Sequence, residues 1–369
     1  MVHRVGTTNY GGGRLTRRQF LRTTAGLAVA LFLPGCETAP LTPASQPAPA
    51  APVATERYTK EAPWHLGRST RGDTTPWMVM FSAHVEYGVQ EKYGGRFAGY
   101  SCIAANWDAN KQIEDIRRLL REGVDLLLID PLDTSVVAAG IGEAMDAGVP
   151  VILACTRAGT SPYVGWVRLN EEARGKACAD WLQHTGSGGQ VVVLASAPAH
   201  DNTELWLQAV SQGLEEQPGV QGATVARCGW SWAAARVAMG RLLDSGTPVD
   251  ALAVNCGVVG KGAVEAFLER GRPVPPVAGA DDWNGWLRQA SRTGVRFLGF
   301  TGGANLGLRC VEQAVKVLSG EPVLPYEEFP WQTFDENGLG GYYRPELSDH
   351  YWAVHDLPQA WIDRMFRPQ

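Results

Sequence analysis

The stretch DLLLIDPLDTSVVAAGIGEAMDAGVPVILACTR, residues 125–157, decides the fold of this chain. It begins with a nearly unbroken apolar run that ends at Asp130, which is typical of a parallel strand buried on both faces. Apolar residues at helical spacing follow, and Thr134 or Ser135 can cap that helix. Residues 151–155 form a second apolar strand. Such a strand, helix, strand unit is almost always right-handed and brings the carboxyl ends of both strands to one edge.

Polar side chains follow the two strands of this unit directly. Asp130 ends the first strand, and Thr156 and Arg157 follow the second. In open α/β sheets, ligands bind outside the carboxyl ends of the strands. The unit therefore predicts a binding site at this edge.

Strand and helix patterns alternate along the rest of the chain in two runs that join near residue 168. Two such runs predict an α/β fold with two doubly wound lobes that face each other. The first expected strand is residues 77–81, followed by a loop at 82–87, and the helix expected at 304–318 should return to the first lobe. We expect an N-terminal lobe of residues 73–168 and 302–324, and a C-terminal lobe of residues 169–301 and 325–369 that includes a tail extension.

The front of the chain carries export signals. Arg17 and Arg18 lie in the twin-arginine pattern TRRQFLR, and a short apolar stretch leads to LPGC, which resembles a lipobox ending at Cys36. Residues 1–36 are predicted to be a signal peptide, and acylation of Cys36 would anchor the protein outside the plasma membrane. The alternative is a plain export signal with an incidental cysteine. Residues 37–72, rich in proline and alanine at their start, are predicted to be a linker.

Charge and cysteine content restrict the partners of the exported chain. The leader holds five arginines and no acidic residue, so removing them from 33 basic residues against 38 acidic ones leaves a net charge of −10. This balance argues against nucleic acid as a partner. Six cysteines remain outside any metal-binding spacing, and we favour buried free thiols over disulfides. They are Cys102, Cys155, Cys178, Cys228, Cys256 and Cys310.

No catalytic signature is present in the sequence. HExxH, GxSxG and Walker motifs are absent, and the glycines of residues 257–262 are spaced GxxGxG rather than GxGxxG. The sequence therefore gives no reason to expect an enzyme, a cofactor or a bound metal.

Hydrogen-bonding side chains and aromatic rings recur at the expected strand ends. Asp130, Arg157, Asn255 and Asp281 can bind vicinal hydroxyls, and Trp230 and Trp283 can cover the apolar side of a ring. Each has an alternative role: Asp130 could cap a helix, Arg157 could pair with a surface acid, and the tryptophans could pack the lobes. The loop expected at 82–87 adds Tyr87 and His84, the latter alternatively a solvated residue.

The linked segments LNEEARGKACADWL, ALAVNCGVVGKGAVEAFLERG, VAGADDW and VKVLSGEPV, together with the opening stretch, resemble periplasmic sugar-binding proteins of the ribose-binding type. The resemblance covers about two thirds of the chain. It implies two Rossmann-like lobes joined by three crossing segments, here expected near Asn170, Thr301 and Leu324.

The resemblance also assigns roles to individual positions. Asp130 stands where the family often has a sugar-contacting Asn, and Arg157, Asn255 and Asp281 coincide with an Arg, an Asn and an Asp of the family. Trp230 coincides with a stacking aromatic. Two positions depart from the family, because Thr301 replaces a hinge-side Gln and Val210 replaces a ligand-binding Arg. The first loop also lacks the usual paired phenylalanines.

These features together predict a monomeric solute receptor whose lobes close on a monosaccharide or a polyol. Thr156, Asn170 and Trp283 complete the expected set of ligand contacts. The expected partners are an ABC permease and, through the lipid anchor, the membrane. The alternatives are a sensory receptor for a signal molecule or nucleoside coupled to a membrane kinase, and an exported enzyme.

Overall fold

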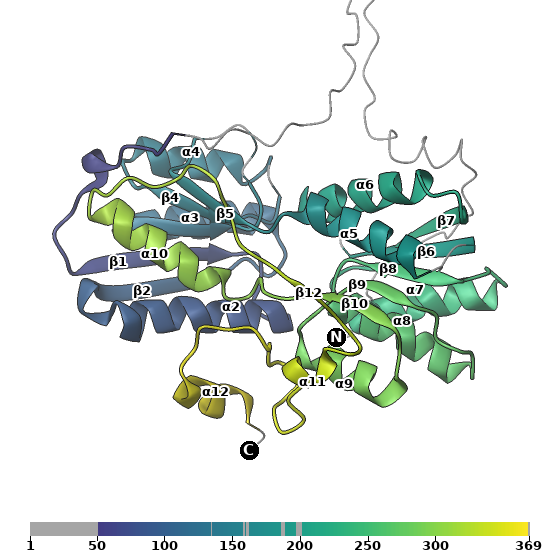
Figure 1. Cartoon of the computed structure of the whole chain (residues 1–369). Coiled ribbons are helices and arrows are strands. Elements are labelled where there is room, and N and C mark those ends of the chain that lie inside the picture. The colour runs from purple at the N-terminus through teal and green to yellow at the C-terminus, as the bar shows by residue number, and fades with distance from the viewer. Residues whose placement is uncertain are drawn as a thin grey trace, which may run out of the picture.

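The computed structural model describes residues 51–133, 135–157, 159, 162–185, 189–196 and 201–367. In these residues the chain forms two six-stranded sheets, each covered by helices on both faces, as Figure 1 shows. The predicted signal peptide, Cys36 and the first part of the predicted linker lie outside the described residues. Among the described residues, no helix combines the length and the apolar character that crossing a membrane requires.

The first sheet is parallel throughout and has the strand order β2-β1-β3-β4-β5-β11. Its strands are β1 (Trp64–Thr70), β2 (Phe97–Ala104), β3 (Leu126–Asp130), β4 (Val151–Ala154), β5 (Gly165–Arg168) and β11 (Glu327–Glu328). Its helices are η1 (Glu56–Tyr58), α2 (Pro76–Tyr87), η2 (Gly88–Lys92), η3 (Gly94–Arg96), α3 (Ala109–Arg121), α4 (Ala138–Asp146) and α10 (Leu306–Leu318).

The second sheet has the order β7-β6-β8-β9-β10-β12, and only β12 runs antiparallel to its neighbour. Its strands are β6 (Gly189–Ala195), β7 (Val220–Arg227), β8 (Ala251–Val254), β9 (Val277–Asp281), β10 (Phe297–Phe300) and β12 (Thr333–Asp335). The helices around it are α5 (Glu171–His184), α6 (Asp201–Glu215), α7 (Trp232–Asp244), α8 (Gly257–Glu269) and α9 (Asn284–Thr293), and the chain ends with α11 (Leu339–Tyr342) and α12 (Gln359–Phe366). The predicted α/β class with two doubly wound lobes is confirmed.

Local sequence signals explain how the opening stretch folds. Every residue of β3 is buried, in agreement with its apolar run. The helix that follows begins at Ala138. In the turn before it, Asp133 Oδ1 accepts from the backbone N–H groups of Ser135 and Val136, both at 2.9 Å. These bonds hold the pKa of Asp133 below its usual range. The N-cap of α4 is Val137 without a side-chain cap, so the cap predicted at Ser135 is wrong, while Thr134 lies outside the described residues.

The start of the folded region differs from the prediction. The strand expected at 77–81 is part of helix α2, and β1 lies in the segment predicted to be linker. Upstream of β1 the chain is also packed, because Val53 forms an antiparallel bridge with Val323. The folded region therefore begins well before residue 73.

Three segments cross between the sheets. They join β5 to α5, β10 to α10, and β11 to β12. Thr301 N donates to Gln332 O at 2.8 Å, and Gln332 N donates to Thr301 Oγ1 at 3.0 Å, so two crossings are bonded to each other. Asn170 and Thr301 lie on crossings as expected, but the third crossing follows Glu328 rather than Leu324, because β11 still pairs with the first sheet.

The six cysteines that follow Cys36 are free thiols. Four are buried and Cys256 is partly buried, but Cys102 is exposed, contrary to the expectation that all six are buried. Cys102 lies on β2, an edge strand of the first sheet, where one face remains in contact with solvent.

Candidate functional site

A cavity of about 100 Å³ lies where strands of both sheets end. Its walls come from the segments that follow β1, β2, β4, β5, β6, β7, β8 and β10, from the last residue of β9 and from the C-terminal segment, so both lobes contribute. The lining residues are Arg71, Thr75, Trp77, Met78, Trp107, Cys155, Leu169, Glu171, Arg174, Asn202, Thr203, Trp230, Asn255, Cys256, Asp281, Gly302 and Trp352. Residues of both lobes thus line one shared space at the strand ends.

Two buried ion pairs flank this cavity. In the first lobe, Arg71 Nε lies 2.8 Å from Asp130 Oδ2, and both side chains are almost fully buried. On α5, Arg174 Nη1 lies 3.2 Å from Glu171 Oε1, and the guanidinium stacks on the ring of Phe300. Burial raises the pKa of both carboxyls. Since Arg174 Nε has no hydrogen-bond partner among the described residues, this pair retains a donor for a ligand oxygen.

Asp281 and Asn255 stand at the ends of two adjacent strands in the second lobe. Asp281 accepts from Gly257 N at 2.8 Å, and burial raises its pKa to about 6. Asn255 Nδ2 donates to Ser196 Oγ at 2.7 Å, and that hydroxyl bonds to Thr203 Oγ1 at 3.1 Å. This network fixes the orientation of the amide beside the cavity, as a polar recognition site requires.

Strained backbone occurs in the first-lobe loops around the cavity. Asn106, Trp107 and Cys155 have φ angles of 54°, 66° and 62°, in the left-handed region that residues other than glycine rarely adopt. Trp107 and Cys155 line the cavity, and a Cβ on Gly72 would come within 2.9 Å of the Trp107 ring. Such strain is characteristic of sites where the surrounding structure holds residues for function.

Among the described residues, the lining of the cavity holds no activated nucleophile. Burial raises the pKa of the thiols of Cys155 and Cys256, so both stay protonated and unreactive at neutral pH. Among the described residues that line the cavity there is no histidine to act as a base. The described lining provides carboxylates, guanidinium groups, an amide and flat indole rings.

The structure brings Trp230, Asn255 and Asp281 into the lining of the cavity, as the sequence predicts for site residues. Asp130 is adjacent and reaches the cavity through its ion pair with Arg71. Trp283, the N-cap residue of α9, is buried but does not line the cavity. The cavity wall instead includes Trp352, which forms an isolated bridge with Trp283.

The other predicted contacts lie elsewhere. Thr156 is buried outside the lining and Arg157 is exposed. Asn170 caps α5, where its Oδ1 accepts from Ala173 N at 2.8 Å. Thr301 Oγ1 accepts from Gln332 N and so bonds two of the crossings to each other. Val210 is fully buried in the core of the second lobe.

His84 and Tyr87 belong to helix α2 rather than to a loop. His84 is fully buried, its Nε2 accepts from Asp356 N at 3.1 Å, and burial lowers its pKa to about 4. The imidazole is therefore neutral and structural. Tyr87 lines a second cavity of about 350 Å³.

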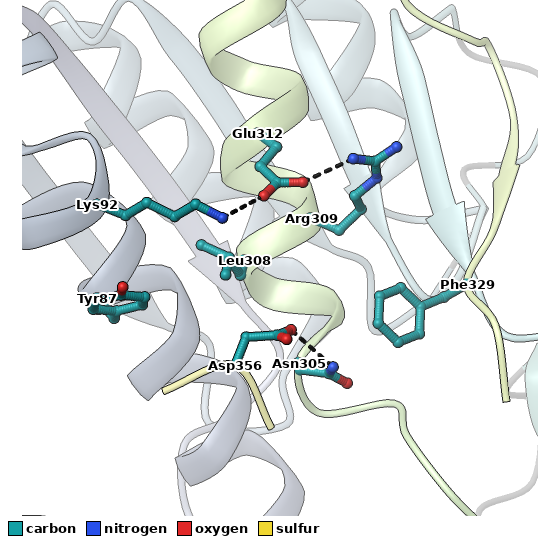
Figure 2. Close-up of a pocket in the computed structure, with 8 residues that line it drawn as sticks. All are labelled: Tyr87, Lys92, Asn305, Leu308, Arg309, Glu312, Phe329 and Asp356. Atoms are coloured by element: carbon teal, nitrogen blue, oxygen red, sulfur yellow. Dashed lines mark hydrogen bonds and ion pairs between the residues drawn. The ribbon is translucent and has the colours of Figure 1, made fainter. Parts of the chain in front are cut away.

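Figure 2 shows this second cavity, which lies beside α10. Lys92 and Arg309 both pair with Glu312 at 2.8 Å, and Asn305 Nδ2 donates to Asp356 at 2.9 Å. This space is larger, but the cavity at the strand ends is lined from both sheets and includes Arg174, whose Nε has no hydrogen-bond partner among the described residues. The cavity at the strand ends is therefore the stronger candidate for a ligand site.

The residues that the sequence did not indicate have two origins. Arg71 follows β1 and Trp77 lies in α2, two elements that the sequence analysis did not place, and Trp107 lies in the loop after β2. Arg174 lies in the first turns of α5, and the sequence analysis did not single it out. A usable signal was the capping Asn170, which places the charged residues after it at a helix N-terminus next to the strand ends.

Comparison with known proteins supports the fold. Residues 75–322 match the model of the periplasmic binding protein domain. The ribose import binding protein of Bacillus subtilis is 23% identical over 53% of this chain and 63% of its own length. The xylitol-binding protein of Mycolicibacterium smegmatis is 22% identical over 48% of this chain and 52% of its own length. The chain thus spans less than two thirds of both relatives.

Solved structures show the same architecture. A Mycobacterium smegmatis protein in complex with β-D-fucofuranose superposes with a TM-score of 0.70 at 20% identity, over 75% of this chain and 93% of that one. An ABC transporter solute-binding protein of Bacillus halodurans with bound myo-inositol gives a TM-score of 0.69 at 20% identity, over 76% and 96%. With the family model covering most of the folded region, the chain belongs to the periplasmic binding proteins and has the type I fold of their sugar-binding members.

Proposed function

We propose that this protein is an extracytoplasmic receptor that encloses one monosaccharide or polyol between its lobes and delivers it to an ABC permease. The observation that carries the proposal is the cavity at the strand ends of both sheets, with its buried carboxylates, guanidinium groups and indoles. Carboxylates and guanidinium groups bind vicinal hydroxyls with defined geometry, and indole faces cover the apolar side of a sugar ring. The relatives named for ribose, xylitol, fucofuranose and myo-inositol have this ligand chemistry in common.

Closure of the lobes is the second part of the proposal. The three crossings form the hinge, and a ligand that contacts both lobes stabilises the closed form because it binds that form more tightly. The export pattern and Cys36 support a lipid anchor outside the plasma membrane. Incorporation of a radiolabelled fatty acid at Cys36 reports directly on the anchor, and an unlabelled protein would contradict it.

A second candidate function is sensing. One protein of the same fold is the fructose-binding periplasmic domain of a hybrid two-component system, with a TM-score of 0.68 at 19% identity over 75% of this chain. In such a receptor, closure would pass to a kinase instead of a permease. Reconstitution with candidate permeases separates the two, since only transport requires ligand release into the cell.

Isothermal titration calorimetry of the exported protein tests the binding function. The panel is D-ribose, xylitol, myo-inositol, L-arabinose, D-fructose and glycerol, and nucleosides are titrated beside it. We expect saturable binding with one site per chain for at least one compound. Saturable binding of nucleosides together with no heat from any sugar or polyol would overturn the proposed ligand class.

A further inference from the structure

The C-terminal extension, residues 336–367, lies outside the matched family domain and packs on both lobes. Figure 1 shows it beneath the two lobes, with α11 beside α9 and α12 beside α2. On the second lobe, Arg288 Nε lies 2.8 Å from Asp349 Oδ1. On the first lobe, Trp361 Nε1 donates to Glu91 Oε1 at 2.7 Å. The extension therefore connects the lobes in addition to the three crossings.

The middle of the extension is fixed next to the ligand cavity by Asp282. The carboxylate Oδ2 of Asp282 accepts from Val354 N at 2.7 Å, and its backbone O accepts from Ala353 N at 3.1 Å. Asp282 directly follows the cavity residue Asp281. Together with the bridge to Trp283, these bonds hold Trp352 in one position at the cavity wall.

Trp352 has the chemistry of a ligand contact. Its side chain is 3% exposed, and its Nε1 has no hydrogen-bond partner among the described residues. A buried indole N–H normally finds an acceptor, because leaving it unpaired costs free energy. A ligand hydroxyl or ring oxygen in the cavity can supply that acceptor.

We propose that the C-terminal extension forms a third wall of the ligand site and that Trp352 is a specificity-determining contact to a ligand oxygen. This inference rests on the proposed binding function. It assigns to the extension a role in selecting the ligand that neither lobe supplies alone.

The test compares Trp352→Phe and Trp352→Ala with the unchanged full chain, using calorimetry with the sugar and polyol panel. Trp352→Phe removes the N–H donor and should weaken binding of the preferred compound about fivefold, the effect of one neutral hydrogen bond. Trp352→Ala also removes the ring and should weaken it about 30-fold or more, as expected of a buried aromatic contact. We also expect the order of preference within the panel to change.

The matched control is Trp286→Phe. Trp286 is a fully buried tryptophan of the second lobe whose Nε1 also lacks a partner among the described residues, but it does not line the cavity. Its variant should bind within about twofold of the unchanged chain. Circular dichroism confirms that each variant is folded.

The outcomes separate the two proposals. Unchanged affinity and preference in both Trp352 variants would overturn the role of the extension while leaving the binding function intact. If the unchanged chain binds nucleosides instead of sugars, the proposed ligand class fails, and the same variants on the nucleoside then decide the role of Trp352. A chain that binds none of these compounds contradicts both proposals.

Discussion

Asp281 combines a position at the end of a buried strand with an environment that disfavours its charge. Burial raises its pKa to about 6, although the N–H groups of Gly257 and Trp283 both donate to it. Because a carboxylate accepts more than two hydrogen bonds, Asp281 retains capacity for a ligand hydroxyl. Its ionisation near neutral pH should therefore be coupled to ligand binding.

Acidification is expected to weaken ligand binding through Asp281. Below a pKa of about 6 the carboxyl is protonated and loses an acceptor, so affinity should fall about tenfold between pH 7 and pH 5. Calorimetry at pH 5, 6 and 7 checks this result. Asp281→Asn should bind weakly at all three values, and an equally steep pH profile in that variant would show that another group is responsible.

The stability of the free protein should change in the opposite direction. Because the pKa of Asp281 is higher in the folded state than in the unfolded state, the folded state binds more protons than the unfolded state between pH 4 and 6. The contribution of Asp281 to the free energy of unfolding therefore falls as pH rises through that window. Urea unfolding of the unchanged chain and of Asp281→Asn isolates this contribution, which should be absent from the variant.

Site residues could be predicted where a strand end was itself recognisable. Asn255 and Asp281 directly follow apolar runs, so their place at the ligand edge followed from the sequence. Trp352 could not be found in this way. It reaches the cavity from a polar, aromatic tail, through hydrogen bonds to Asp282 that have no signature in sequence spacing.

At the scale of elements, the errors have a physical cause in β1 and α2. The β1 sequence WHLGRST is not an apolar run, because it contains the buried Arg68. Arg68 Nη1 donates to Ser82 Oγ at 2.8 Å and the guanidinium stacks on Phe81, while Nε and Nη2 have no hydrogen-bond partner among the described residues. Helix α2 contains five consecutive apolar residues that resemble a strand. It is apolar on two sides because Met80 packs in one core cluster and Phe81 in another. Most other elements followed from their patterns, because central strands such as β3 and β8 are apolar runs buried on both faces and helices such as α3 bury one face.

Strand β9 depends on a bulge that brings Asp281 to the cavity. Gly279 has a φ of 103°, and the pairing of β9 with β10 shifts register at this level. A Cβ on Gly279 would lie 1.8 Å from the carbonyl oxygen of Val254. Only glycine therefore fits between the two strands.

Gly279→Ala should lower the free energy of unfolding by about 3 kcal/mol or more, because it adds backbone strain to a steric overlap. Gly142→Ala in α4 is the matched control. No atom lies within 4 Å of a Cβ built there, and alanine should raise stability by up to about 1 kcal/mol. Urea unfolding followed by circular dichroism measures both, and equal stability of the two variants would contradict the bulge.

At the scale of the whole molecule, the two sheets direct their strand ends toward one shared cavity, and the extension adds a further connection between the lobes. The two-lobed plan followed from two runs of alternating elements in the sequence. The position of the tail did not follow from the sequence. Residues 325–369 were expected to pack on the second lobe alone, whereas Trp361 and Asp356 form hydrogen bonds with residues of the first lobe. Contacts between distant segments depend on tertiary geometry that local patterns do not encode.

The crystal structure of the protein with the sugar or polyol that binds most tightly in the panel tests the central claim most directly. We predict that the ligand lies in the cavity at the strand ends, with hydroxyls bonded to Asp281 and Arg174 and an oxygen facing Trp352. A ligand found instead beside Lys92, Arg309 and Glu312, with the cavity at the strand ends unchanged, would contradict the account.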